Sequence, residues 1–84
     1  MSLSVLPIDQ RILKYIQPRG ISKVFYKQLS LLMQNPKYPS LRTELMLPKA
    51  RGLYSFRVTL KYRAIFVYKD TNTIEIIDVN DHYQ

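Results

Sequence analysis

The sequence predicts a small α+β domain in which an N-terminal strand and two helices pack on a C-terminal antiparallel β-meander. Two observations predict this class. Apolar residues recur at helical spacing before Gly52, and they alternate or form short strand-like runs after it. The chain has 84 residues, of which 46% are hydrophobic, so it has room for one core. We therefore expect a single domain over residues 1–84.

The first elements are a short strand and a helix. Residues 2–7 are expected to form the strand, which Pro7 restricts to an edge or an end of the sheet. Asp9 is a suitable N-cap for a helix that ends before Pro18 and Gly20. The apolar residues of this helix are Ile12, Leu13 and Ile16.

The second helix is predicted to have Ser22 as its N-cap and to stop before Pro36. Its apolar residues fall on one stripe at helical spacing. They are Val24, Phe25, Leu29, Leu32 and Met33. The following connector, residues 37–51, contains Pro39 and Pro48 and is expected to be a loop or an irregular edge. Loops of about 15 residues in so small a domain carry function more often than they merely join elements.

Three strands are predicted at residues 53–60, 62–69 and 73–79, with a hairpin loop at residues 70–72. In the first of them, alternation separates the side chains onto two faces. Tyr54, Phe56 and Val58 share one face. Arg57 is therefore expected on the opposite face, away from the aromatic core.

Positive charge is concentrated in the middle of the chain. Thirteen Lys and Arg residues face six acids, which gives a formal net charge of +7. Between Arg11 and Arg63 the only acid is Glu44. This distribution is typical of a nucleic-acid-binding protein or of a protein with an acidic partner. The alternative explanation is that the charge serves solubility alone.

Several functional classes are excluded by composition. With two glycines, one histidine and no cysteine, the chain offers no glycine-rich phosphate loop, no zinc site and no signature of a hydrolytic triad. We therefore expect no metal and no cofactor. No apolar stretch approaches the roughly 20 residues that span a bilayer, so no membrane association and a cytoplasmic location are expected.

Two short motifs resemble a known family. The strands contain Arg57-Val58-Thr59-Leu60-Lys61-Tyr62-Arg63, and the last residues include Asp81-His82-Tyr83. With the order of elements, these residues resemble the RelE/ParE superfamily of bacterial toxin–antitoxin toxins, which has a microbial RNase-like fold. The Asp-His-Tyr segment is similar to the YoeB branch of ribosome-dependent messenger-RNA endonucleases. In that branch a glutamate lies eight residues before the glycine that opens the signature strand, as Glu44 does before Gly52.

The resemblance implies a metal-independent endoribonuclease. Such an enzyme needs a base, an acid and a cation around one phosphate. By similarity, Glu44 would take the proton of the ribose 2′-OH, His82 would protonate the departing 5′ oxygen, and Arg63 would stabilise the phosphate charge. Further RNA or phosphate contacts are expected from Arg57, Tyr83, Lys49, Arg51 and Lys61. The implied partners are a cognate antitoxin, the ribosome and messenger RNA.

Other functions stay open at this stage. The chain could be a non-enzymatic inhibitor like the gyrase-targeting ParE branch, or an inactive module that binds protein or DNA. Phe56 stands where the YoeB branch tends to carry a second basic residue, which weakens the phosphate-binding pattern. Glu44 could also be an exposed acid paired with Arg42 or Lys49, an interaction worth about 0–1 kcal/mol.

Overall fold

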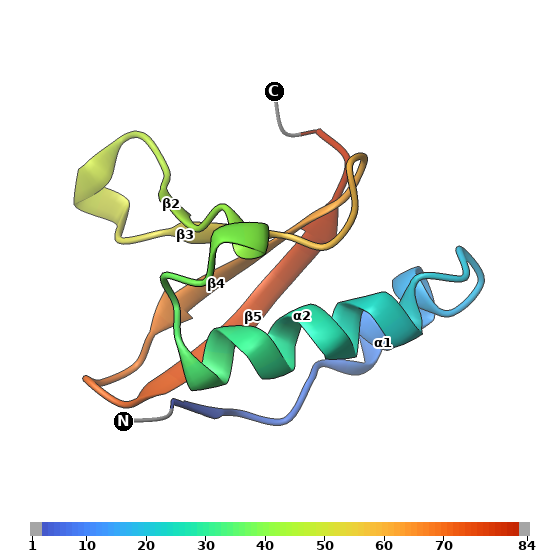
Figure 1. The fold of residues 1–84 in the computed structure, drawn as a ribbon, viewed down its shortest axis with the longest axis horizontal. Helices are drawn as coiled ribbons and strands as arrows, with labels where there is room; N and C mark the ends of the chain where they lie inside the picture. Colours follow the sequence, from blue (N-terminus) through green and yellow to red (C-terminus); the bar gives the residue numbers. More distant parts are fainter. Residues whose placement is uncertain (1–2, 83–84) are drawn as a thin grey trace.

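A five-stranded sheet with two helices on one side forms the fold (Figure 1). The computed structural model describes residues 3–82. The helices are α1 (Gln10–Ile16) and α2 (Ser22–Gln34), and the strands are β1 (Ser4–Val5), β2 (Glu44–Leu45), β3 (Tyr54–Arg57), β4 (Arg63–Tyr68) and β5 (Thr73–Asn80). The strand order is β1-β5-β4-β3-β2. The predicted α+β class, with two helices on a C-terminal meander, is confirmed.

The edges of the sheet differ from a simple meander. At one edge β1 runs parallel to β5, with Ser4 opposite Thr73 and Val5 opposite Ile74, so the sheet is mixed. At the other edge, the connector supplies β2, which pairs with β3 in antiparallel orientation. Single-turn 3₁₀ helices precede and follow β2. They span Pro39–Leu41 and Lys49–Arg51. The connector is therefore an ordered sheet edge as well as a loop.

The helix boundaries follow the predicted stop signals but only one predicted cap. The Asp9 carboxylate accepts a 2.7 Å hydrogen bond from the Arg11 backbone N–H, which confirms the N-cap of α1. The prediction for α2 is wrong, because Ser22 is its first helical residue and Ile21 is the N-cap, without a side-chain hydrogen bond. Ile21 is buried, so apolar packing rather than capping fixes this helix start. Within residues 3–82, no helix has the length and hydropathy to span a membrane.

The hydrophobic core lies between the helices and the sheet face that they cover. Phe25 of α2 stacks on Phe56 of β3 with ring centroids 6.4 Å apart, and Phe56 lies 6.0 Å from Phe66 of β4. Each of these three rings is fully buried. The remaining buried apolar residues are Ile12, Ile16, Ile21, Leu29, Leu32, Leu41, Val58, Ala64, Ile74, Ile76 and Val79.

A β-bulge in β5 sets which of its side chains face away from the core. Ile65 lies opposite Asp78, but the next residue, Phe66, lies opposite Ile76, so Ile77 is the extra residue. The Arg11 guanidinium donates a 2.8 Å hydrogen bond to the Ile77 carbonyl at this point. Beyond the bulge, the inward position falls to Val79, so the register places Asp78 and Asn80 on the helix-free side. The Asp78 carboxylate lies at the sheet edge, 3.4 Å from Nη1 of Arg11 in α1.

Ionisation of Tyr68 is expected to destabilise the fold at alkaline pH. Burial, and next the neighbouring Tyr54, raise the pKa of Tyr68 above its usual value. A raised pKa contributes stability that is present below the unfolded-state value of about 10 and is lost as the pH rises through the folded-state value. We therefore expect the unfolding free energy of the wild type to fall relative to that of Tyr68→Phe as the pH rises above about 10.

Urea denaturation followed by circular dichroism over the alkaline range measures this difference. Tyr26→Phe is the matched control, because Tyr26 is exposed on α2. A Tyr68→Phe curve that runs parallel to the wild-type curve throughout would contradict the expectation.

Candidate active site

The helix-free face of the sheet holds a buried arginine at the start of its middle strand. Arg63, the first residue of β4, is only 6% exposed. Its Nε and Nη2 atoms donate to the Ser55 hydroxyl at 3.1 and 2.9 Å, and Nη2 also donates to the Arg42 carbonyl at 2.6 Å. A buried cation is costly unless it is fixed by hydrogen bonds. These bonds hold the guanidinium in one position between β3 and the connector.

Glu44 lies on the same face, one strand away. It occupies β2 directly opposite Ser55 of β3, and residues opposite each other in an antiparallel pair point to the same side of the sheet. Because Ser55 accepts hydrogen bonds from Arg63, Glu44 and Arg63 flank a single serine. Glu44 is exposed as a residue. The predicted base and the predicted cation are thus brought together.

A second cation lies directly beside Arg63. Arg57 of β3 is opposite Arg63 in the ladder, and both line a pocket of about 160 Å³ together with Lys61. Thr59 and Leu60 complete the lining. Like charges directly opposite each other repel across a ladder. An anion between these side chains would remove that repulsion, so the pocket suits a phosphate group.

The connector next to Glu44 is conformationally strained. Arg42 has a φ of 44°, in the left-handed region that residues other than glycine seldom adopt. Its carbonyl is the one that accepts the 2.6 Å hydrogen bond from Arg63. Such conformations cost about 1–3 kcal/mol and persist where surrounding contacts impose them. The bond from Arg63 therefore couples the position of β2, and with it Glu44, to the buried guanidinium.

His82 lies apart from the cationic pocket. Its side chain is 86% exposed, and its Nε2 atom is 3.7 Å from Asp81 Oδ1. With Arg11 and Tyr15 of α1 and the end of β5, it lines a separate pocket of about 210 Å³. The two pockets are neighbours across the β4–β5 ladder. Arg63 lines the cationic pocket, and Asn80, which lies opposite Arg63, lines the His82 pocket. The predicted acid therefore lies near Arg63 in the ladder but not in its pocket.

The remaining predicted contacts divide between the pocket and the connector. Lys61 lines the cationic pocket. Lys49 and Arg51 are exposed in the 3₁₀ helix between β2 and β3, and neither lines that pocket. Tyr83 lies outside the described residues. Among residues 3–82, no group of three or more His, Cys, Asp and Glu side chains is arranged to hold a metal ion.

Two residues that organise this face were missed by sequence reasoning. Ser55 links Arg63 to β2, and Asn80 continues the row of Arg57 and Arg63 onto β5. The signal for Ser55 was its alternation with Arg57 on one strand face. No comparable signal existed for Asn80, because its orientation depends on the bulge at Ile77.

Solved structures of toxins share this fold. The YoeB/ParE toxin from Agrobacterium tumefaciens matches with a TM-score of 0.71 and 16% identity, over 99% of this chain and 100% of that chain. The YoeB dimer from Staphylococcus aureus matches with a TM-score of 0.71 and 22% identity, over 99% and 98% of the two chains. The heterotetrameric YoeB–YefM toxin–antitoxin complex from the same organism matches with a TM-score of 0.69 and 22% identity, again over 99% and 98%.

These matches establish a fold rather than an activity. No protein-family model and no curated protein matches the sequence. The identities to the solved toxins are low, whereas the superposition covers almost the whole of both chains. The fold predicted from the resemblance to the RelE/ParE superfamily is confirmed.

Proposed function

We propose, on the premise that this chain has the YoeB/ParE toxin fold, that it is the toxin of a toxin–antitoxin pair and cleaves messenger RNA on the ribosome. The observation that carries the proposal is the row formed by Glu44, Ser55 and Arg63, with Arg57 beside it, on the helix-free face. This row combines the carboxylate of an exposed residue with a buried cation, which are two of the three groups that metal-independent RNA cleavage requires.

In the proposed reaction, the Glu44 carboxylate takes the proton of a ribose 2′-OH. The 2′ oxygen forms a bond to the adjacent phosphorus as the bond from phosphorus to the 5′ oxygen breaks. His82 gives a proton to that departing oxygen. The products are a 2′,3′-cyclic phosphate and a 5′-hydroxyl end. The proposed reaction therefore requires neither a cofactor nor a metal ion.

The two arginines have different parts in the proposal. Arg63 is held by Ser55 and the Arg42 carbonyl, so it supplies a fixed positive charge that needs no reorganisation during the reaction. Arg57 is half-buried, and among residues 3–82 its guanidinium has no hydrogen-bond or ion-pair partner. It can therefore present its forked donors to the non-bridging phosphate oxygens. Lys61 adds a third charge to the same pocket.

The proposed acid has to reach the phosphate from its exposed position. His82 follows the last strand by two residues, and its backbone N–H donates to the Asn80 side chain at 3.1 Å. Because its imidazole is 86% exposed, rotation about its side-chain bonds meets little packing resistance. The role proposed for His82 therefore includes a change of side-chain orientation when RNA is bound.

Removal of the His82 imidazole is expected to lower the cleavage rate by about 10²- to 10⁴-fold, the usual contribution of a general acid. The measurement uses purified ribosomes that translate a defined message, with new 5′ ends mapped by primer extension. Wild type is compared with His82→Ala, and Lys27→Gln, at an exposed residue of α2, is the control. Ribosome-dependent cuts that persist at the wild-type rate in His82→Ala would contradict the assignment of the acid.

A second candidate function is favoured by one observation. His82 lines a pocket other than that of Arg57 and Arg63, an arrangement that a non-enzymatic inhibitor of the ParE kind would tolerate. Such a protein would act by binding DNA gyrase. The ribosome assay separates the two, because a wild-type protein that makes no cuts but inhibits supercoiling by purified gyrase belongs to the second class.

The cognate antitoxin and the RNA are proposed as partners on the basis of charge. The formal net charge of +7 favours association with an acidic protein and with phosphate backbones. In Staphylococcus aureus, YoeB is found in a complex with YefM, and both belong to a toxin–antitoxin pair. We expect an antitoxin of this chain to inhibit cleavage when the two are mixed.

A further inference from the structure

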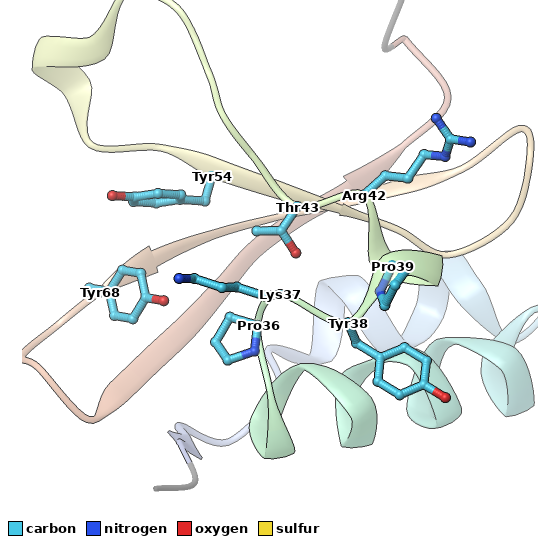
Figure 2. A pocket seen from close by; sticks show the side chains of 8 residues that line it. All are labelled: Pro36, Lys37, Tyr38, Pro39, Arg42, Thr43, Tyr54 and Tyr68. Carbon is cyan, nitrogen blue, oxygen red and sulfur yellow. The ribbon is translucent and has the colours of Figure 1, made fainter.

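A second pocket lies on the helix-bearing side of the sheet, and it adjoins the candidate active site only through Arg42, whose carbonyl accepts from Arg63. It has a volume of about 370 Å³ and lies between the start of the connector and the outer ends of β3 and β4 (Figure 2). Its lining consists of Pro36, Lys37, Tyr38, Pro39, Arg42, Thr43, Tyr54 and Tyr68. Tyr54 shares a sheet face with the buried rings, whereas Glu44 points to the other face. The pocket and Glu44 are therefore on opposite sides of β2.

One positive charge projects into this pocket. Figure 2 shows the Lys37 side chain extended toward the space between the rings of Tyr54 and Tyr68, whose centroids are 5.2 Å apart. Among residues 3–82, the Lys37 ammonium has no hydrogen-bond or ion-pair partner. The Thr43 hydroxyl points into the same space, and it is buried without a partner in this part of the chain. A ligand with an acceptor group would satisfy both.

Partly exposed aromatic and aliphatic side chains lie in and near this pocket. Tyr38 and Tyr68 line the pocket and are 45% and 38% exposed. Leu45 lies opposite Tyr54 in the ladder, on the same sheet face, and is 40% exposed. Exposed large apolar side chains near a pocket are a feature of interaction surfaces. The pocket thus combines a single ammonium group with an aliphatic and aromatic border.

We propose that this pocket is a docking site for a segment of another protein that carries an acidic side chain flanked by apolar residues. The carboxylate would bind the Lys37 ammonium and the Thr43 hydroxyl, and the apolar neighbours would cover Leu45 and Tyr38. Charge complementarity identifies the occupant, because the ammonium needs one anion and the surrounding surface offers apolar contacts. The inference stands independently of the proposed nuclease activity.

Nucleic acid fits this surface less well than a peptide. A phosphate backbone is bound by several cations in a row, as the pocket of Arg57, Lys61 and Arg63 provides on the opposite face. In Figure 2 the Arg42 guanidinium points away from the pocket interior, so Lys37 is the cation directed into it.

A displayed library of random 12-residue peptides tests the proposal. Peptides are selected on the wild-type protein and their dissociation constants are measured by fluorescence anisotropy. We expect the enriched peptides to carry Asp or Glu next to aliphatic residues and to lose roughly tenfold or more in affinity for Lys37→Gln. Lys27→Gln is the matched control, since Lys27 is an exposed lysine on α2. Replacing the peptide's acid by lysine should restore binding to Lys37→Glu.

Three results would overturn the proposal. The first is the absence of acidic peptides among those enriched, and the second is equal affinity for wild type and Lys37→Gln. The third is a selective loss of single-stranded 12-nucleotide RNA binding in Lys37→Gln, which would assign the pocket to nucleic acid. Lys37→Gln is expected to retain the ribosome-dependent activity of the wild type, whatever that activity proves to be. Failure of peptide docking is thereby distinguishable from failure of the proposed nuclease.

Discussion

Replacement of Arg63 by methionine is expected to slow the proposed messenger-RNA cleavage by about 10²- to 10³-fold, as loss of a preorganised electrostatic group does. The side chain is 6% exposed and is fixed by Ser55 and the Arg42 carbonyl, so its charge is already in place before RNA binds. The substitution also removes the donors to these two groups, at a cost of about 1–3 kcal/mol for each buried group left unsatisfied. Rates from primer extension and unfolding free energies from urea titration measure the two effects separately.

The controls for Arg63 distinguish the effect of its hydrogen-bonded position from the effect of its positive charge. Arg63→Lys keeps the charge, but a lysine has no planar fork to bond Ser55 and the Arg42 carbonyl together, so it should restore little activity. Lys69→Met removes a charge from an exposed residue that pairs with Glu75 at 3.5 Å, and it should leave the rate unchanged. A folded Arg63→Met protein that cleaves at the wild-type rate would show that this arginine serves structure alone.

Replacement of Phe66 by alanine is expected to lower the unfolding free energy by about 3–5 kcal/mol. Phe66 is fully buried, and its ring lies 5.5 Å from Tyr54, 6.0 Å from Phe56 and 5.8 Å from Tyr68. Native domains are stable by only about 5–15 kcal/mol, so this variant is expected to be partly unfolded at 37 °C. Urea denaturation monitored by circular dichroism measures the loss.

Leu60→Ala is the surface control for the stability loss in Phe66→Ala. Leu60 is 91% exposed at the turn between β3 and β4, and a surface substitution there should change stability by no more than about 0.5 kcal/mol. Similar losses in the two variants would mean that Phe66 does not occupy the core.

Elements set by local sequence were predicted well. The Asp9 cap, the end of α2 before Pro36 and the loop at residues 70–72 each depend on residues close together in the chain. The alternation in β3 likewise placed Arg57 on the face opposite Phe56. These features follow from side-chain type and from spacing within one segment, and both can be read from the sequence.

Features that depend on distant pairing could not be predicted in the same way. The parallel contact of β1 with β5 joins residues far apart in the chain, and the two-residue strand β2 gains its register from β3. The bulge at Ile77 turns Asp78 and Asn80 toward the helix-free face, although the strand itself has no glycine to mark it. Tertiary packing also overrode the predicted cap of α2, because Ile21 is buried.

The candidate site was predicted in part. Glu44, Arg57 and Arg63 lie on one face, and the ladder registers account for this proximity. The support from Ser55 was not foreseen, because it requires the β3–β4 register. His82 lines a neighbouring pocket, so its part in the reaction remains the proposal that depends most on the effect of bound RNA.

The most direct test of the proposed chemistry is cleavage of a message that has a single 2′-deoxynucleotide at the cut site. Attack by the 2′ oxygen requires that hydroxyl, so cleavage on purified ribosomes should stop at the deoxy position and continue at unmodified sites in the same reaction. The ends formed at those sites should be a 2′,3′-cyclic phosphate and a 5′-hydroxyl. Cutting at the deoxy position, or no cutting of the unmodified message by the wild-type protein, would contradict the account.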